Sequence, residues 1–71
     1  MTEATALAAA AASSDPGEGL RAVAALRRLL ERLEAVQVRN ARNRGWAWQA
    51  IADSLGVSRQ AVHKKHGGKG R

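Results

Sequence analysis

The sequence predicts an all-α fold of three helices: a long first helix followed by two short ones. Apolar residues recur at three- and four-residue intervals over residues 20–42, which is the periodicity of a helix. A second set, at residues 48–55, is followed by a glycine that suits a helix end and a serine that suits a helix start. The 71 residues set a ceiling of one small domain.

Residues 1–15 are expected to form a disordered arm, because Ala, Thr and Ser dominate and little is large enough to bury. A helix that docks a partner is the alternative. The first twelve residues hold no Lys or Arg, unlike the start of a signal peptide. The run Ala8–Ala12 is too short to cross a bilayer. We therefore expect a cytoplasmic protein without a membrane segment.

Residues 16–66 are expected to form the helical domain. Asp15 suits a helix cap, Pro16 suits a first turn, and Glu18 can reach back as in a capping box. The long helix then runs over residues 20–42, before a stretch in which an asparagine or a glycine can adopt the left-handed conformation.

The apolar surface of helix 20–42 is wider than the single stripe expected of a surface helix. Two short helices can cover only one of its sides. A second copy of the chain is the simplest cover for the other side, through a parallel or antiparallel helix pair. The alternative is that the N-terminal arm folds back. The side chains expected at the dimer contact are Leu26, Leu29, Leu30, Leu33 and Val36.

The most specific pattern in the chain reads Ile51-Ala52-x-x-Leu55-Gly56-Val57-Ser58-x-x-x-Val62. Gly56 can end one helix at positive φ, and Ser58 can cap the next. The small side chain of Ala52 lets the two helices cross closely, and Val57 and Val62 are expected to fill the angle between them. The pattern predicts two short helices joined by a tight turn, which is a helix-turn-helix.

This pattern resembles the helix-turn-helix of bacterial transcription regulators and the DNA-reading region 4 of sigma factors. The resemblance covers residues 46–66, under a third of the chain. It implies that helix 58–66 lies in the major groove of double-stranded DNA. Such motifs often place an apolar residue three after the position of Val62, whereas this chain has Lys65 there. That departure suggests a short recognition helix.

The basic charge lies in the same half of the chain as the motif. The net charge is +6, and residues 39–71 hold eight basic side chains and one acid, against four and five in residues 1–38. Lys and Arg replace the counterions condensed on DNA phosphates, so this distribution suits a polyanion. A solvated basic face is the alternative.

The second short helix is expected to carry the base contacts. Arg59 and Gln60 lie in its first turn and suit guanine and adenine edges, where a good pair contributes about 1–3 kcal/mol of discrimination. His63 is a third candidate for base or phosphate contact. The candidates for phosphate contact and general attraction are Ser58, Gln49, Arg42, Arg44, Lys64, Lys65 and Lys69.

The C-terminal tail and Trp46 each have two possible roles. Residues 67–71 are expected to form a flexible basic tail, which either follows the DNA or remains solvated. Trp48 is expected in the core. Trp46 is also expected there, with a contact to the sugar-phosphate backbone as the alternative.

The sequence shows no clear pattern of catalytic or metal-binding residues. The chain has no cysteine, and His63 and His66, three residues apart, lack a third metal ligand. No nucleophile–base pair or paired carboxylates are evident, so we expect neither an enzyme nor a cofactor. We expect a sequence-specific double-stranded DNA-binding regulator of transcription, acting as a homodimer in the nucleoid. The alternatives are an interaction module that uses helix 20–42, or a nucleoid-associated protein with little sequence preference.

Overall fold

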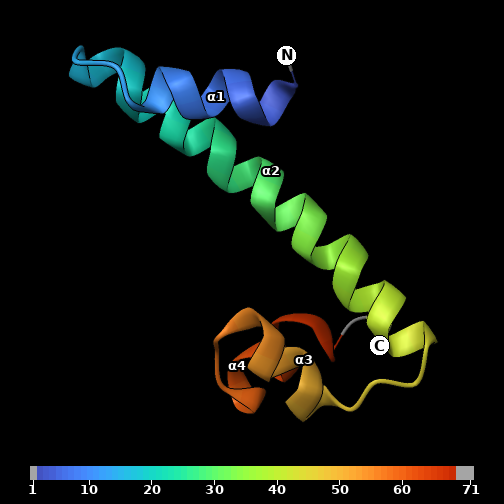
Figure 1. Cartoon of the computed structure of the whole chain (residues 1–71). Coiled ribbons are helices and arrows are strands. Elements are labelled where there is room, and N and C mark those ends of the chain that lie inside the picture. The colour runs from blue at the N-terminus through green and yellow to red at the C-terminus, as the bar shows by residue number, and fades with distance from the viewer. Residues whose placement is uncertain (1, 69–71) are drawn as a thin grey trace. The chain divides into compact units, whose positions relative to one another are not determined.

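The computed structural model describes residues 2–68, where four helices are joined by short turns and there is no strand (Figure 1). Its helices are α1 (Glu3–Ala11), α2 (Pro16–Asn43), α3 (Trp48–Leu55) and α4 (Arg59–His66). The expected all-α class is confirmed, and the expected number of helices is corrected from three to four. None of the described helices is both long enough and apolar enough to cross a membrane.

The additional helix, α1, occupies the segment that was expected to be a disordered arm, so that expectation is wrong. Alanine has the highest helix propensity, and it dominates this segment. The hydroxyl of Thr2 caps the helix by accepting a hydrogen bond from the backbone N–H of Thr5 at 3.1 Å. The negative charge of Glu3 in the first turn interacts favourably with the positive end of the helix dipole and so stabilises the helix. Propensity and capping thus form a helix although α1 has no buried residue.

The start of α2 follows the expected capping residue. The Asp15 carboxylate accepts a hydrogen bond from the backbone N–H of Glu18 at 2.8 Å. The Glu18 carboxylate accepts one from the Ser13 hydroxyl, also at 2.8 Å, rather than closing the expected capping box. Gly19 is buried, and a Cβ there would lie 3.5 Å from the Ala11 carbonyl oxygen. Glycine therefore allows the end of α1 to approach α2 closely.

The chain divides into two compact units, Met1–Leu33 and Glu34–Arg71. The N-terminal unit holds α1 and the first part of α2. The C-terminal unit holds the last turns of α2 together with α3 and α4, and it contains the motif identified in the sequence.

Two glycines end helices in the C-terminal unit by the same device. At the end of α2, Gly45 has a φ of 85°, and the backbone N–H of Trp46 bonds to the Ala41 carbonyl. At the end of α3, Gly56 has a φ of 73°, and the N–H of Val57 bonds to the Ala52 carbonyl. Both are Schellman-type ends, which satisfy the last carbonyls of a helix and reverse the chain.

The core of the C-terminal unit is small. Its buried side chains are Val38, Ile51, Ala52 and Val62. Ala41 and Trp48 pack against them and are partly buried, as expected for Trp48. Ala52 is completely buried, and a methyl group at that position allows α3 and α4 to pack closely. The motif positions thus account for most of the core.

Candidate nucleic-acid interface

The two short helices and their turn are built by the residues of the motif. Gly56 ends α3 in the left-handed conformation, and Ser58 begins α4. The Ser58 hydroxyl accepts a hydrogen bond from the backbone N–H of Ala61 at 3.0 Å, which caps α4. Val57 is 46% exposed, so the expectation that it fills the angle between the helices is wrong. Ala52 and Val62 bring the helices close without it.

One side of α4 is buried and the opposite side faces solvent. In α4, which lies wholly within the described residues, Val62 is the one buried residue. Arg59, Gln60 and Lys64 are exposed. The first turn of the helix therefore offers a guanidinium and a carboxamide, the two groups that suit guanine and adenine edges in the major groove.

A stack of three side chains joins α2, α3 and α4. The guanidinium carbon of Arg42 lies 4.6 Å from the centroid of the Trp48 ring, within the range of a cation–π contact. The His63 ring meets Trp48 edge-on, with centroids 5.2 Å apart and an interplanar angle of 89°. Arg42 also donates a hydrogen bond to the Trp46 carbonyl at 2.7 Å. These contacts orient Arg42 and His63, both of which were candidates for DNA contact.

Glu34 joins α2 to the end of α4. Its carboxylate lies 2.7 Å from Nε2 of His66 and 3.3 Å from Nζ of Lys65. The hydrogen bond with His66, assisted by Lys65, lowers the pKa of Glu34 below its ordinary value. Lys65, a candidate for phosphate attraction, therefore has an acidic partner within the chain. The sequence interpretation missed this contact because no local pattern links residues 34 and 66.

The remaining candidates are distributed as follows. The Gln49 carboxamide donates a hydrogen bond to Asp53 at 2.8 Å, so Gln49 is engaged within α3. Arg44 borders a cleft between α2 and α3. Lys69 lies outside the described residues, as does most of the expected tail.

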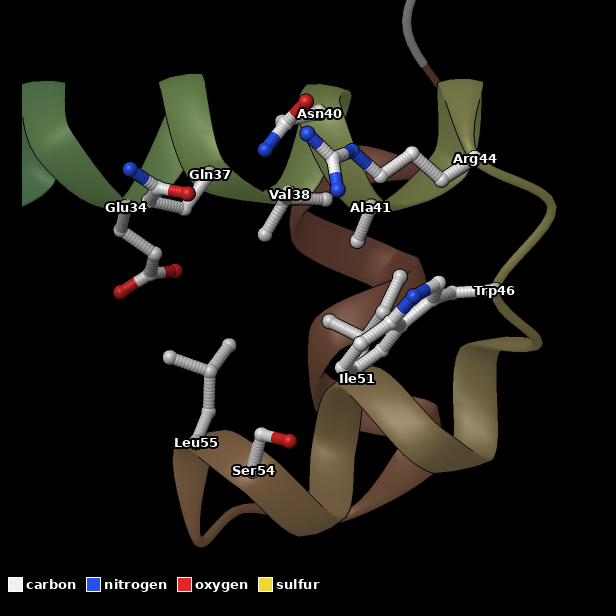
Figure 2. A pocket seen from close by; sticks show the side chains of 10 residues that line it. All are labelled: Glu34, Gln37, Val38, Asn40, Ala41, Arg44, Trp46, Ile51, Ser54 and Leu55. Carbon is white, nitrogen blue, oxygen red and sulfur yellow. The ribbon is translucent and has the colours of Figure 1, made fainter.

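The cleft is a feature that the sequence did not predict. It has a volume of about 260 Å³, and its apolar lining includes Val38, Trp46, Ile51 and Leu55 (Figure 2). Trp46 is 43% exposed, so the expectation that it lies in the core is wrong. Leu55 is 41% exposed. Helical spacing correctly placed Leu55 on the inner face of α3. The α2 side chains on the border of the cleft are mostly polar, and its apolar ones there are Val38 and the small Ala41; the polar ones are Glu34, Gln37, Asn40 and Arg44.

The side chains expected at a dimer contact lie on α2. Leu30 is 62% exposed, and Leu33 and Val36 are about half exposed. Leu26 and Leu29 are partly buried. An exposed row of large apolar side chains at helical spacing is typical of a surface that a partner covers.

The electrostatics of the C-terminal unit favour a negatively charged partner. Its sequence holds two acids, Glu34 and Asp53, against the basic majority. Both acids are bound by side chains of the unit itself. Among the described residues, no group of three His, Asp or Glu side chains is placed to hold a metal ion. No protein-family model, curated protein or solved structure matches the chain.

Proposed function

We propose that this chain binds double-stranded DNA with sequence preference and regulates transcription. The observation that carries the proposal is the two-sided character of α4. Val62 fixes one side in the core, while Arg59, Gln60 and Lys64 are exposed on the rest of the helix. A helix presented in this way fits the width of the major groove, where its first turn meets base edges.

The charge distribution supports DNA over other partners. Arg59 and Gln60 carry the base contacts, and Lys64 and Arg44 add attraction to phosphates. Because the unit holds only two acids in its sequence, and Lys65 pairs with one of them, Glu34, little negative charge opposes the approach of a polyanion. Affinity is therefore expected to fall steeply with salt.

We further propose that the chain binds as a homodimer through α2. Leu30 and Leu33, with the neighbouring Val36, leave apolar surface exposed that a second copy would cover. One short helix reads few base pairs, so a monomer would discriminate poorly. Two copies would read half-sites about 34 Å apart on one face of the duplex.

The same exposed row favours a second candidate, an interaction module in which α2 docks a different protein. Sedimentation equilibrium of the purified chain separates the two. A purified chain that sediments with the mass of a dimer supports the homodimer. A monomer that forms a defined complex with another protein supports the module.

The test of DNA recognition begins with duplexes selected from a random pool at ~150 mM salt, where bulk electrostatic attraction is weakened. Binding to the selected duplex is then compared for the parent, Arg59→Ala, Gln60→Ala and the control Arg28→Ala. Arg28 is exposed on α2, so the control removes the same charge as Arg59→Ala without altering α4. The two α4 variants are expected to bind about 5- to 150-fold more weakly, corresponding to 1–3 kcal/mol per base contact.

The outcome distinguishes three cases. A loss confined to the α4 variants supports the proposal. Parent-like binding by Arg59→Ala and Gln60→Ala shows that α4 is not the recognition helix. Binding that bulk DNA competes away equally well, with no enriched sequence, indicates a nucleoid-associated protein without sequence preference.

A further inference from the structure

We propose that Glu34 is a positioning residue for DNA recognition: it holds the end of α4 against α2 and withdraws Lys65 and His66 from the duplex. The inference rests on the proposed DNA-binding function. It assigns a role in specificity to a residue that does not itself touch DNA, and it concerns the end of α4 opposite to Arg59 and Gln60.

The contact is well formed for a small domain. One oxygen of Glu34 serves both partners, at 2.7 Å from Nε2 of His66 and 3.3 Å from Nζ of Lys65. The side chain of His66 is 11% exposed and that of Glu34 is 27% exposed, so water screens the pair only partly. The lowered pKa of Glu34 is consistent with an ionised carboxylate held by donors.

The position of α4 depends on this contact because the helix has little else to hold its far end. Val62 is its one buried side chain, within a helix that is fully described. The Ser58 cap fixes the first turn. The edge contact of His63 with Trp48 lies between the two ends. Glu34 is therefore the constraint that acts on the last turn, and it limits how far α4 can tilt about Val62.

The contact also affects which charges are free to meet the duplex. Lys65 remains half exposed but is paired with Glu34, as is His66, whereas Arg59, Gln60 and Lys64 are exposed and form no ion pair within residues 2–68. If Lys65 were released, it would add a phosphate contact that carries no sequence information. Glu34 therefore favours base-specific over general binding.

The test compares Glu34→Gln with the matched control Glu31→Gln. Both remove one negative charge from α2, but Glu31 is exposed and forms no ion pair within residues 2–68. Affinities for a selected duplex and for random duplexes are measured over a range of salt concentrations. Glu34→Gln is expected to bind random duplexes more tightly and to steepen the log–log salt dependence by about 0.9 beyond the control, the value for one added phosphate contact.

The decisive quantity is the ratio of the affinity for the selected duplex to the affinity for random duplexes. It is expected to fall about tenfold or more in Glu34→Gln and to stay at the parent value in Glu31→Gln, because positioning of base contacts worth 1–3 kcal/mol is lost. Glu34→Asp gives a second test: it keeps the charge and shortens the reach of the carboxylate, and it is expected to lower the ratio as well. Equal ratios in all variants would overturn the proposal.

Hydrogen exchange in the free chain separates this proposal from the DNA-binding function itself. The backbone amides of residues 62–66 are expected to exchange faster in Glu34→Gln than in Glu31→Gln without any DNA present. Faster exchange together with an unchanged binding ratio would show that Glu34 is structural only. Failure of the parent to bind any duplex would overturn the proposed function, whatever the exchange rates show.

Discussion

Replacing Gly56 by alanine tests the turn between α3 and α4. Gly56 has φ 73° and ψ 29°, in the left-handed region, and a Cβ added there would meet no atom within 4 Å. The cost is therefore conformational rather than steric. An L-residue pays about 1–2 kcal/mol in this region, and the reduced entropy of the unfolded chain offsets about 0.4–1 kcal/mol of it. We expect Gly56→Ala to lower the free energy of unfolding by about 1 kcal/mol.

Thermal and urea unfolding followed by far-UV circular dichroism measure this change. A loss of about 1 kcal/mol corresponds to a fall in Tm of about 4–8 °C for a domain of this size. The chain is short enough for chemical synthesis, which allows D-alanine at position 56 as the matched control. D-alanine favours positive φ, so it is expected to leave stability unchanged or to raise it slightly. Equal stabilities of the L- and D-alanine chains would refute the left-handed turn.

Three further predictions concern the core of the C-terminal unit, the ion pair of Glu34, and the exposed apolar side chains of α2. Ile51→Ala, at a side chain that is 3% exposed, is expected to cost about 2–5 kcal/mol and to abolish a cooperative urea transition, because small domains have little stability to lose. The pKa of Glu34 is lower in the folded chain than in the unfolded chain, so the unfolded chain binds a proton at this carboxylate first as the pH falls. The free energy of unfolding is therefore expected to decline as the pH falls below the ordinary pKa of 4.5 and through the lowered pKa of the folded chain. Glu34→Gln is expected to flatten this pH dependence of the urea midpoint. The double variant Leu30→Glu with Leu33→Glu is expected to be a monomer in sedimentation equilibrium, whereas the parent is expected to form a concentration-dependent dimer. Helix content is expected to be retained, because both side chains are exposed. A parent that is monomeric at all concentrations would contradict the homodimer.

The motif could be predicted from the sequence because its signals are local. Gly56 and Ser58 act on their own backbone neighbourhood, and the spacing that buries Ile51, Ala52 and Val62 is a property of one helix at a time. Such features depend on residues within about one and a half helical turns of each other. The helix boundaries around the turn followed from them.

The contacts that the sequence did not reveal join residues far apart in the chain. The pairing of Glu34 with His66 depends on how α4 crosses α2, which no local spacing specifies. The exposure of Leu55 and Trp46 depends on what α2 places across the cleft, where most of its side chains are polar and give little apolar cover. The N-terminal helix lacks the apolar spacing that predicts the other helices, because it has no buried residue; alanine propensity and the Thr2 cap form it instead.

The most direct test of the account is nuclear magnetic resonance of the isotope-labelled chain titrated with a duplex selected from a random pool at ~150 mM salt. We predict that the largest amide and side-chain shifts occur at Arg59, Gln60 and Lys64 in α4, with smaller ones at Arg44. Shifts confined to the apolar row of α2, or no shifts at any residue, would contradict the claim that α4 binds DNA.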